Sequence, residues 1–462
     1  MSQDAEDTKP KTPVDNQGAT TTSSTGGLSR KTWLVILAVV VVVAVAVGVA
    51  VPLATRDSSS GSDDMGGNDS NQTPSTGPAN PVKWLQKGET IEGHTLKDRF
   101  GWSVAASASG LVVAVGAISI DADGSFRQVQ VYEYKNNEWA QLGQSLESEN
   151  LTDYFGWDVA LSSDGTTLAV GTRRGAYVRV YRLSDENTWA QLGSDVTGLQ
   201  GGCFGCAVAL SQDGDLLAVG AKDANSTNFV ASGVVQTFSY NGAWSQSGPT
   251  LEGDGTNQDF GASVALTPAG SRLAVGAPNA DYVRVFDYKN SQDWDPVVIL
   301  EGETVGDKFG YKVAMSTSGE TIAISAHRNS EIGYGAGHVR VFQNVGDFAI
   351  WQQVGEDIDG DNDGQFGFSL ALSGDGSRVA AGANLDNGNG KGFATGSVRI
   401  FDYNGMSWVQ AGDELIGQDN QDEFGQSVAM SEDGKIVVVG TKFGVGGEEQ
   451  ERTGHVKVFQ DS

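Results

Sequence analysis

Alternating hydrophobic and polar residues mark a unit that recurs seven times along the chain. Each unit opens with a Phe-Gly pair that starts an alternating run, and a second apolar run ends on a small residue. The Phe-Gly pairs begin at Phe100, Phe155, Phe204, Phe260, Phe309, Phe366 and Phe424, and the closing small residues are Gly116, Gly171, Gly220, Gly276, Ser325, Gly382 and Gly440. In every unit the two landmarks are 16 residues apart. Such fixed spacing indicates an array of equivalent supersecondary units.

Each unit predicts four antiparallel strands. Turns such as Ser-Ser-Asp-Gly at residues 162–165 separate the first two runs, and Asp-Gly between alternating runs is a strong hairpin signal because glycine accepts a positive φ. Residues 178–181 exemplify the third strand and residues 189–192, which begin with a Trp, the fourth. Seven such sheets, stacked radially, bury their faces against one another. The sequence therefore predicts an all-β fold, a seven-bladed β-propeller.

The two ends of the array predict how the ring closes. The last unit stops at residues 456–459 and has no Trp strand of its own. An orphan Trp strand at residues 84–88 precedes the first unit, in register with residues 408–412. We therefore expect the N-terminal strand to complete the last blade and to remove an unpaired edge.

Three segments precede the propeller, which we assign to residues 82–462. Residues 1–31 are polar and are expected to be a disordered tail. Residues 32–54 are uncharged and apolar, and at about 1.5 Å per residue they are long enough to cross a hydrocarbon core of roughly 30 Å. We interpret them as a transmembrane signal-anchor helix, with a cleavable signal peptide as the alternative. Residues 55–81 are rich in Ser, Gly and Asp, which is typical of a flexible linker.

Charges beside the apolar segment predict its orientation. Arg30 and Lys31 precede the segment, whereas Arg56 and then Asp57, Asp63 and Asp64 follow it, which places the N-terminus in the cytoplasm. The propeller would then lie outside the cell or in the lumen of the secretory pathway. Four Asn-x-Ser/Thr sequons would be glycosylated there, at Asn68, Asn71, Asn150 and Asn225.

The overall charge argues against one class of partner. The chain carries a net charge of −28, and almost all of the excess acid lies after residue 56. Such a surface repels nucleic acid phosphates and anionic lipid headgroups. We therefore do not expect nucleic-acid binding, and the membrane contact should be limited to residues 32–54.

One unit carries a complete family signature. Phe260-Gly261 is followed by Gly276-Ala277-Pro278, and with its six siblings this motif resembles the FG-GAP repeat propellers of the integrin α head. The resemblance covers about residues 82–462 and is nearest to the degenerate FG-GAP repeat proteins of microbial eukaryotes and bacteria. It implies a propeller, but propellers host adhesion, sugar binding, scaffolding and catalysis alike.

The chain departs from that family in its calcium-binding turns. Members that bind calcium carry alternating Asp and Asn oxygens between the first two strands. Here those turns read SASG, SSDG, SQDG, TPAG, STSG, SGDG and SEDG, which are too few carboxylates for a cation that takes about six to eight oxygens. We do not expect the calcium sites of the family in these turns.

A different loop offers a candidate calcium site. The sequence DIDGDNDG places carboxylates at alternate positions just before Phe366, at Asp357, Asp359, Asp361 and Asp363. Its second part matches the first half of an EF-hand loop, but Leu370 stands where a bidentate Glu is required. The alternative is an acidic, solvated loop without an ion.

Cys203 and Cys206 are the only cysteines. In an oxidising compartment they could form a local disulfide, since Gly205 permits a tight bend, but an extended strand would hold them too far apart and leave two buried thiols. No Ser/His/Asp order, phosphate-binding loop or dinucleotide-binding glycine pattern stands out, so we do not predict an enzyme.

The remaining prediction concerns the loops. The length of the unit varies mainly between the second and third strands, at residues 118–126, 222–232, 327–336, 384–395 and 442–453. Variable loops on a rigid scaffold often carry binding functions. We expect a single-pass membrane protein whose propeller is an interaction or adhesion module for a protein or glycan ligand. The alternative is a propeller that binds or processes carbohydrate at its central depression.

Overall fold

Seven antiparallel sheets of four or five strands and one two-stranded sheet make up the part of the chain that the computed structural model describes, residues 82–462 without 94–97, 119–127, 151, 199–201, 290–292, 347–349, 362 and 447–450. The predicted tail, transmembrane segment and linker lie outside these residues. Within the described part, no helix has the length and apolar character needed to span a bilayer.

Four of the sheets form the first half of the ring. Blade 1 contains β3 (Phe100–Ala106), β4 (Val112–Ala117), β5 (Gln128–Lys135), β6 (Glu138–Gln141) and β7 (Leu146–Glu147). Blade 2 contains β8 (Phe155–Leu161), β9 (Thr167–Thr172), β10 (Tyr177–Leu183), β11 (Trp189–Gln191) and β12 (Val196–Thr197). Blade 3 contains β13 (Phe204–Leu210), β14 (Leu216–Ala221), β15 (Val234–Tyr240), β16 (Trp244–Gln246) and β17 (Leu251–Glu252). Blade 4 contains β18 (Ser263–Leu266), β19 (Arg272–Ala277), β20 (Tyr282–Lys289) and β21 (Asp293–Glu301).

The other three sheets follow the same order of strands. Blade 5 contains β22 (Val313–Met315), β23 (Thr321–Ala326), β24 (His338–Asn344), β25 (Trp351–Gln353) and β26 (Ile358–Asp359). Blade 6 contains β27 (Ser369–Leu372), β28 (Arg378–Ala383), β29 (Ser397–Tyr403), β30 (Trp408–Gln410) and β31 (Leu415–Ile416). Blade 7 contains β32 (Phe424–Met430), β33 (Ile436–Thr441), β36 (His455–Asp461), β1 (Trp84–Gln86) and β2 (Ile91–Glu92), and β34 (Val445–Gly446) pairs with β35 (Glu451–Arg452) beside it.

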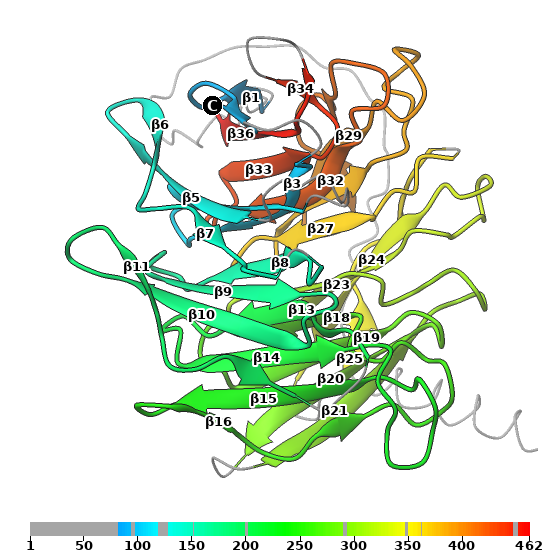
Figure 1. Ribbon diagram of the computed structural model, residues 1–462. Helices are drawn as coiled ribbons and strands as arrows, with labels where there is room; N and C mark the ends of the chain where they lie inside the picture. The colour runs from blue at the N-terminus through cyan, green and yellow to red at the C-terminus, as the bar shows by residue number, and fades with distance from the viewer. Residues whose placement is uncertain are drawn as a thin grey trace, which may run out of the picture. The chain divides into compact units, whose positions relative to one another are not determined.

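The first strand of each blade lies at the axis of the ring. Each first strand packs against the first strands of its two neighbours, so that β3 contacts both β8 and β32. Figure 1 shows these inner strands in the middle of the ring, whereas β6, β11 and β16 lie at its edge. The sequence prediction of an all-β, seven-bladed propeller is confirmed. It missed the short extra strands such as β7 and β12, which extend the pairing of the third strand, and the pair β34–β35.

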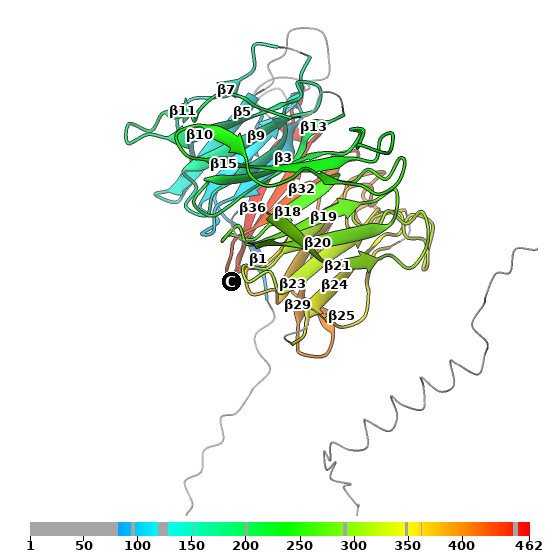
Figure 2. The same cartoon turned by 90° about the horizontal axis from the view of Figure 1, so that it is seen from below.

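Closure of the ring occurs where the sequence predicts it. β1 pairs with β36 in an antiparallel register that sets Trp84 opposite Asp461 and Gln86 opposite Phe459. Both views show β1 beside the C-terminus (Figures 1 and 2). The Trp84 indole also donates a 2.8 Å hydrogen bond to the Ala411 carbonyl of blade 6. The N-terminal strand therefore ties blade 7 to its neighbour as well as completing it.

Each Phe-Gly pair forms the centre of a tight turn. In blade 2 the Trp157 amide donates to the Tyr154 carbonyl at 3.2 Å, and Gly156 has a φ of 85°. Only glycine takes up that φ readily, which explains the second residue of the pair. The phenylalanines are buried in all seven blades and fill the space between adjacent sheets.

The closing small residue is fixed by a neighbouring blade. A Cβ on Gly276 would stand 2.0 Å from the Gly310 carbonyl oxygen of blade 5. In four blades a Ser three residues after the Phe donates to the same carbonyl, as Ser263 does to Gly310 at 3.0 Å. The first and second strands of one blade therefore both contact the Phe-Gly turn of the next blade.

A second set of contacts closes the opposite end of the axis. The second residue of each turn between strands one and two donates its amide hydrogen to the equivalent carbonyl of the next blade. This pattern links Ala108 to Ser163, Ser163 to Gln212, Gln212 to Pro268, Thr317 to Gly374, Gly374 to Glu432 and Glu432 to Ala108. The circle lacks one link because Pro268 has no amide hydrogen.

We predict that Gly276→Ala destabilises the propeller by about 3 kcal/mol, because the added methyl group overlaps the Gly310 carbonyl. Urea unfolding measures this loss. Ser325→Ala is the matched control, since blade 5 already accommodates a Cβ at the equivalent position, and it should cost about 1 kcal/mol or less. Equal losses in the two variants would contradict the close contact as the reason for the small residue.

Candidate ligand-binding site

A pocket of about 710 Å³ lies at one end of the propeller axis. Its wall includes the residue directly after every Phe-Gly pair, namely Trp102, Trp157, Cys206, Ala262, Tyr311, Phe368 and Gln426. Residues just beyond the closing small pairs, such as Arg173 and Lys222, complete the mouth. The volume falls within the roughly 300–1,000 Å³ of typical small-molecule sites. We call this cavity the axial pocket.

The axial pocket has a charge opposite to that of the chain. Six of the 30 Lys and Arg residues line it, but only two of the 58 Asp and Glu residues do. The basic residues are Arg173, Lys222, Lys308, Lys312, Arg328 and Lys442, and the acidic ones are Asp158 and Asp259. A protein with a net charge of −28 thus concentrates positive charge at this end of its axis.

Four of these six basic groups have no acidic partner. Within the described residues, no ion pair is formed by Arg173, Lys308, Lys312 or Arg328, whereas Lys442 lies 2.5 Å from Glu423 and Lys222 lies 3.8 Å from Asp259. Arg173 instead lies over the Trp157 ring at 4.5 Å from its centroid, a cation–π contact that holds the guanidinium at the mouth. Unpaired cations that face a cavity are available to a bound anion.

Aromatic rings form two clusters on the wall. Trp102 and Trp157, from blades 1 and 2, have centroids 4.7 Å apart. Tyr311 lies 3.9 Å from His327 and 5.4 Å from Phe368, which come from blades 5 and 6. Because the blades follow one another around the ring, the aromatic cluster of blades 1 and 2 lies across the axis from the cluster of blades 5 and 6. A flat ligand in the pocket would therefore meet aromatic surface on two sides.

Asp158 and Lys312 stand three residues after the Phe of their blades, the position at which four other blades carry a Ser. Burial raises the pKa of Asp158, whereas Lys312 and the Val208 amide, which donates at 2.9 Å, act to lower it. Blade 2 and blade 5 thus place opposite charges on the pocket wall, below the residues of the mouth. Within the described residues, neither side chain donates to the Gly carbonyl of the next blade as the Ser does, and both line the pocket.

The far end of the axis has the opposite character. A second depression of about 640 Å³ is lined by the turns between the first and second strands. Its charged residues are Asp375, Glu432 and Asp433, and its lining contains no Lys or Arg. Together with the circle of backbone hydrogen bonds, this makes the two ends of the axis chemically distinct.

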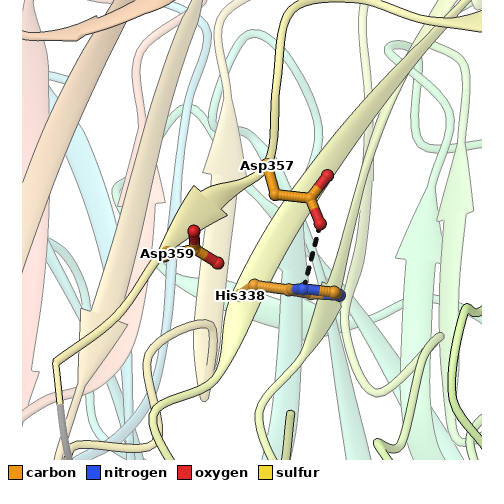
Figure 3. A group of neighbouring side chains, drawn as sticks. All are labelled: His338, Asp357 and Asp359. Carbon is orange, nitrogen blue, oxygen red and sulfur yellow. Dashed lines mark ion pairs between the residues drawn. The ribbon is translucent and has the colours of Figure 1, made fainter. Parts of the chain in front are cut away.

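The predicted calcium loop is only partly brought together. Asp357 and Asp359 approach His338, and these three side chains offer ligand atoms within 4.8 Å of one another (Figure 3). Asp361 and Asp363 are exposed and do not belong to this group. Calcium at these four residues stays a prediction.

Neighbouring groups already satisfy much of the Asp357 carboxylate. His338 Nδ1 lies 3.3 Å from Asp357 Oδ2, and Gln353 donates to Asp357 Oδ1 at 2.6 Å. The Arg340 guanidinium lies 3.6 Å from the same oxygen. Burial raises the pKa of Asp359, although His338 opposes the shift. The group therefore consists of one imidazole and two carboxylates beside a guanidinium. It differs in composition from a calcium loop, which surrounds the ion with oxygen ligands.

The cysteines lie in the turn of blade 3. The Cys206 amide donates to the Cys203 carbonyl at 3.0 Å, and Gly205 has a φ of 95°. The bend brings the two Cα atoms to 5.4 Å, within the range of a disulfide, and the sulfur atoms are in bonding contact. The backbone at Cys203 and Cys206 is therefore bent, and the extended conformation that would hold the two cysteines too far apart for a disulfide does not occur. Cys206 also lines the axial pocket.

Two of the four sequons lie within the described residues. Asn150 and Asn225 are both exposed. The side-chain oxygen of Asn150 accepts from the Thr152 amide at 3.0 Å, and that of Asn225 accepts from the Ala231 amide at 2.9 Å. Asn68 and Asn71 lie outside the described part. Glycosylation stays a prediction at all four.

Comparison with known proteins extends no further than the fold. No protein-family model matches the chain, and no curated protein matches it. Among solved structures, Raptor of Chaetomium thermophilum is similar with a TM-score of 0.55 and 13% identity, over 83% of this chain and 30% of that chain. The Cps50 (Swd1) propeller domain of Myceliophteria thermophila has a TM-score of 0.52 and 12% identity, over 83% and 99%. Hydrazine synthase of Kuenenia stuttgartiensis has a TM-score of 0.51 and 12% identity, over 80% and 97%.

These likenesses show the fold alone, a β-propeller with distant structural similarity to other propellers. Membership of the FG-GAP family stays a prediction. The prediction from the variable loops reached only part of the axial pocket. Lys222, His327, Arg328 and Lys442 lie at the first positions of those loops, whereas the residues after the Phe-Gly pairs lie outside them. Aligning the seven units at the position two after the closing small residue would have revealed Arg173, Lys222, His327 and Lys442 together.

Acid should weaken the folded state through His327. Burial, with help from Arg328, Lys308 and Lys312, lowers the pKa of His327 to about 3. In the unfolded chain this pKa is about 6.5. Between these values the unfolded state binds a proton that the folded state does not, so stability present above pH 6.5 is lost as the pH falls.

We predict that His327→Phe, which keeps an aromatic ring against Tyr311, removes about 2 kcal/mol of the stability loss between pH 7.5 and pH 5. Urea unfolding of the wild type and the variant at both pH values gives this difference. His455, whose pKa burial also lowers to about 3, keeps part of the pH dependence in the variant. An unchanged pH dependence would contradict a neutral, buried His327.

Proposed function

We propose that this protein is a non-catalytic binding head that takes up its ligand in the axial pocket. The observation that carries the proposal is the concentration of unpaired cations and aromatic rings at one end of an otherwise acidic propeller. The pocket opens where the second strands end, the face that also carries the connections to the third strands. The predicted interaction surface and the pocket are thus parts of one face.

The carboxylates near the pocket favour binding over hydrolysis. A glycosidase needs two carboxyl groups about 5–10 Å apart that face the same substrate. Asp259 pairs with Lys222 at 3.8 Å, and Asp158 accepts the Val208 amide. The aspartates before the Phe-Gly turns are likewise engaged in the framework, as Asp153 is by the Phe155 amide at 3.1 Å and Asp307 by Asn329 at 2.8 Å.

The setting of the head completes the proposal. Residues 32–54 would anchor the protein in a membrane with the N-terminus in the cytoplasm, and residues 55–81 would hold the propeller away from the bilayer. The head would then meet its ligand outside the cell or in a lumen. The seven Phe-Gly turns support a relation to the FG-GAP propellers, which would make adhesion or recognition the general role.

We predict that Trp102→Ala together with Trp157→Ala weakens ligand binding at least tenfold, since each truncation removes aromatic surface from the same wall of the pocket. The test is a screen of the full-length chain in detergent against arrays of glycans and cell-surface protein domains. Ligands found in the screen are then measured against the variant.

Met406→Ala and Val409→Ala serve as the control, because both side chains are exposed at the outer edge of blade 6. A thermal melt establishes that both double variants remain folded. Ligands that bind the two variants equally well would place recognition away from the axial pocket. Turnover of a bound polysaccharide would instead favour the alternative, a carbohydrate-processing propeller.

A further inference from the structure

We infer that the axial pocket binds an acidic sugar, a pyranose ring with a carboxylate, at the end of a glycan chain. This inference rests on the proposed function and specifies its ligand. It follows from three properties of the pocket, which are the sign and confinement of its charge, the geometry of its cations, and its aromatic walls.

The confinement of charge limits the length of the anion. Six basic residues line the pocket, whereas the chain as a whole carries −28. A long polyanion such as a nucleic acid would meet the repelling surface on either side of the mouth. A single charged terminal residue places its carboxylate among the cations and avoids that repulsion.

The two unpaired guanidinium groups favour a planar anion. Arg173 and Arg328 reach the mouth from equivalent loops of blades 2 and 5, and neither forms an ion pair with a described carboxylate. A guanidinium can donate two parallel hydrogen bonds to a carboxylate, a geometry that Lys cannot reproduce. The contact of Arg173 with Trp157 restricts its freedom before the ligand arrives, which lowers the entropy lost on binding.

The walls suit the body of a sugar ring. Tyr311 and Phe368 on one side, and Trp102 and Trp157 on the other, offer apolar faces for the C–H groups of a pyranose. Gln426 adds an amide whose oxygen accepts from Asn384 at 3.3 Å and whose NH₂ group donates to no other described residue. Hydroxyl groups of the ligand need donors and acceptors of this kind.

A nucleotide is the main alternative ligand, since it also combines an anion with a flat ring. Among the described residues, the pocket lacks the backbone groups that usually bind its phosphates. Phosphate sites commonly use the backbone amides of a helix N-terminus or a glycine-rich loop before a helix. The part of the chain that the structure describes contains no helix, and the pocket presents side-chain cations instead.

The test uses the full-length chain in detergent, with methyl glucuronide, methyl galacturonide and N-acetylneuraminic acid as probes. Methyl glucoside, methyl galactoside and AMP are the comparison compounds. Quenching of Trp fluorescence reports occupancy beside Trp102 and Trp157, and calorimetry gives the Kd. We expect at least one acidic sugar to bind at least tenfold more tightly than its neutral counterpart, with an affinity that falls as salt is raised.

The variant pair Arg173→Gln and Arg328→Gln should weaken that binding at least tenfold and reduce its salt dependence. The control removes the same charge at Lys135 and Lys289, whose side chains are 68% and 59% exposed on outer hairpins, and should leave the Kd unchanged. If the control weakens binding as much as the variant, the effect comes from net charge and the inference is wrong.

The remaining outcomes separate the inference from the proposed function. Neutral sugars or AMP that bind as well as the acidic sugars, and that lose affinity in the Trp102→Ala and Trp157→Ala variant, overturn the inference but leave the pocket as the binding site. Acidic sugars that bind both pocket variants like the wild type overturn both. Failure of every probe to bind at millimolar concentration also overturns the inference.

Discussion

The contact between a closing small residue and the Phe-Gly turn of the next blade is the constraint on which the rest of the propeller depends. In the glycine-bearing blades a Cβ at the closing position would stand only 2.0–2.4 Å from the neighbouring glycine carbonyl. The backbone of the closing residue therefore contacts the backbone of the next blade's Phe-Gly turn directly, with no side chain between them. This approach fixes the angle between adjacent blades, and it forces the next side chain, the residue after Phe-Gly, into the axial cavity.

The fold follows from the sequence because its determinants are local and repeated. Each Phe-Gly turn needs a glycine with positive φ, and each buried Phe fills one space between two sheets, so the same letters return at the same spacing. The closing strand could be identified as well, since an orphan Trp strand at one end matches a missing one at the other. The short strand β7 and its equivalents escaped prediction because two-residue pairings leave no periodic pattern.

The axial pocket could not be predicted in the same way. Its residues come from seven segments that are far apart in the chain, and only the packing of adjacent blades brings Trp102 near Trp157 or Tyr311 near Phe368. The residue types at these positions differ from blade to blade, because a side chain that faces the cavity is not needed for packing between the sheets. The calcium loop illustrates the converse: the spacing of four aspartates suggested one site, but the backbone directs only Asp357 and Asp359 toward His338.

Closure through β1 has a mechanical consequence. Any tension applied through the chain before residue 82 enters the propeller at β1, whose three residues are the outer edge of blade 7. Antiparallel pairing with β36 would be the first connection to bear that load, and the indole of Trp84 passes part of it to blade 6 through the Ala411 carbonyl. The strand that completes the ring is therefore also the first part of the propeller that would resist a pull on the chain before residue 82.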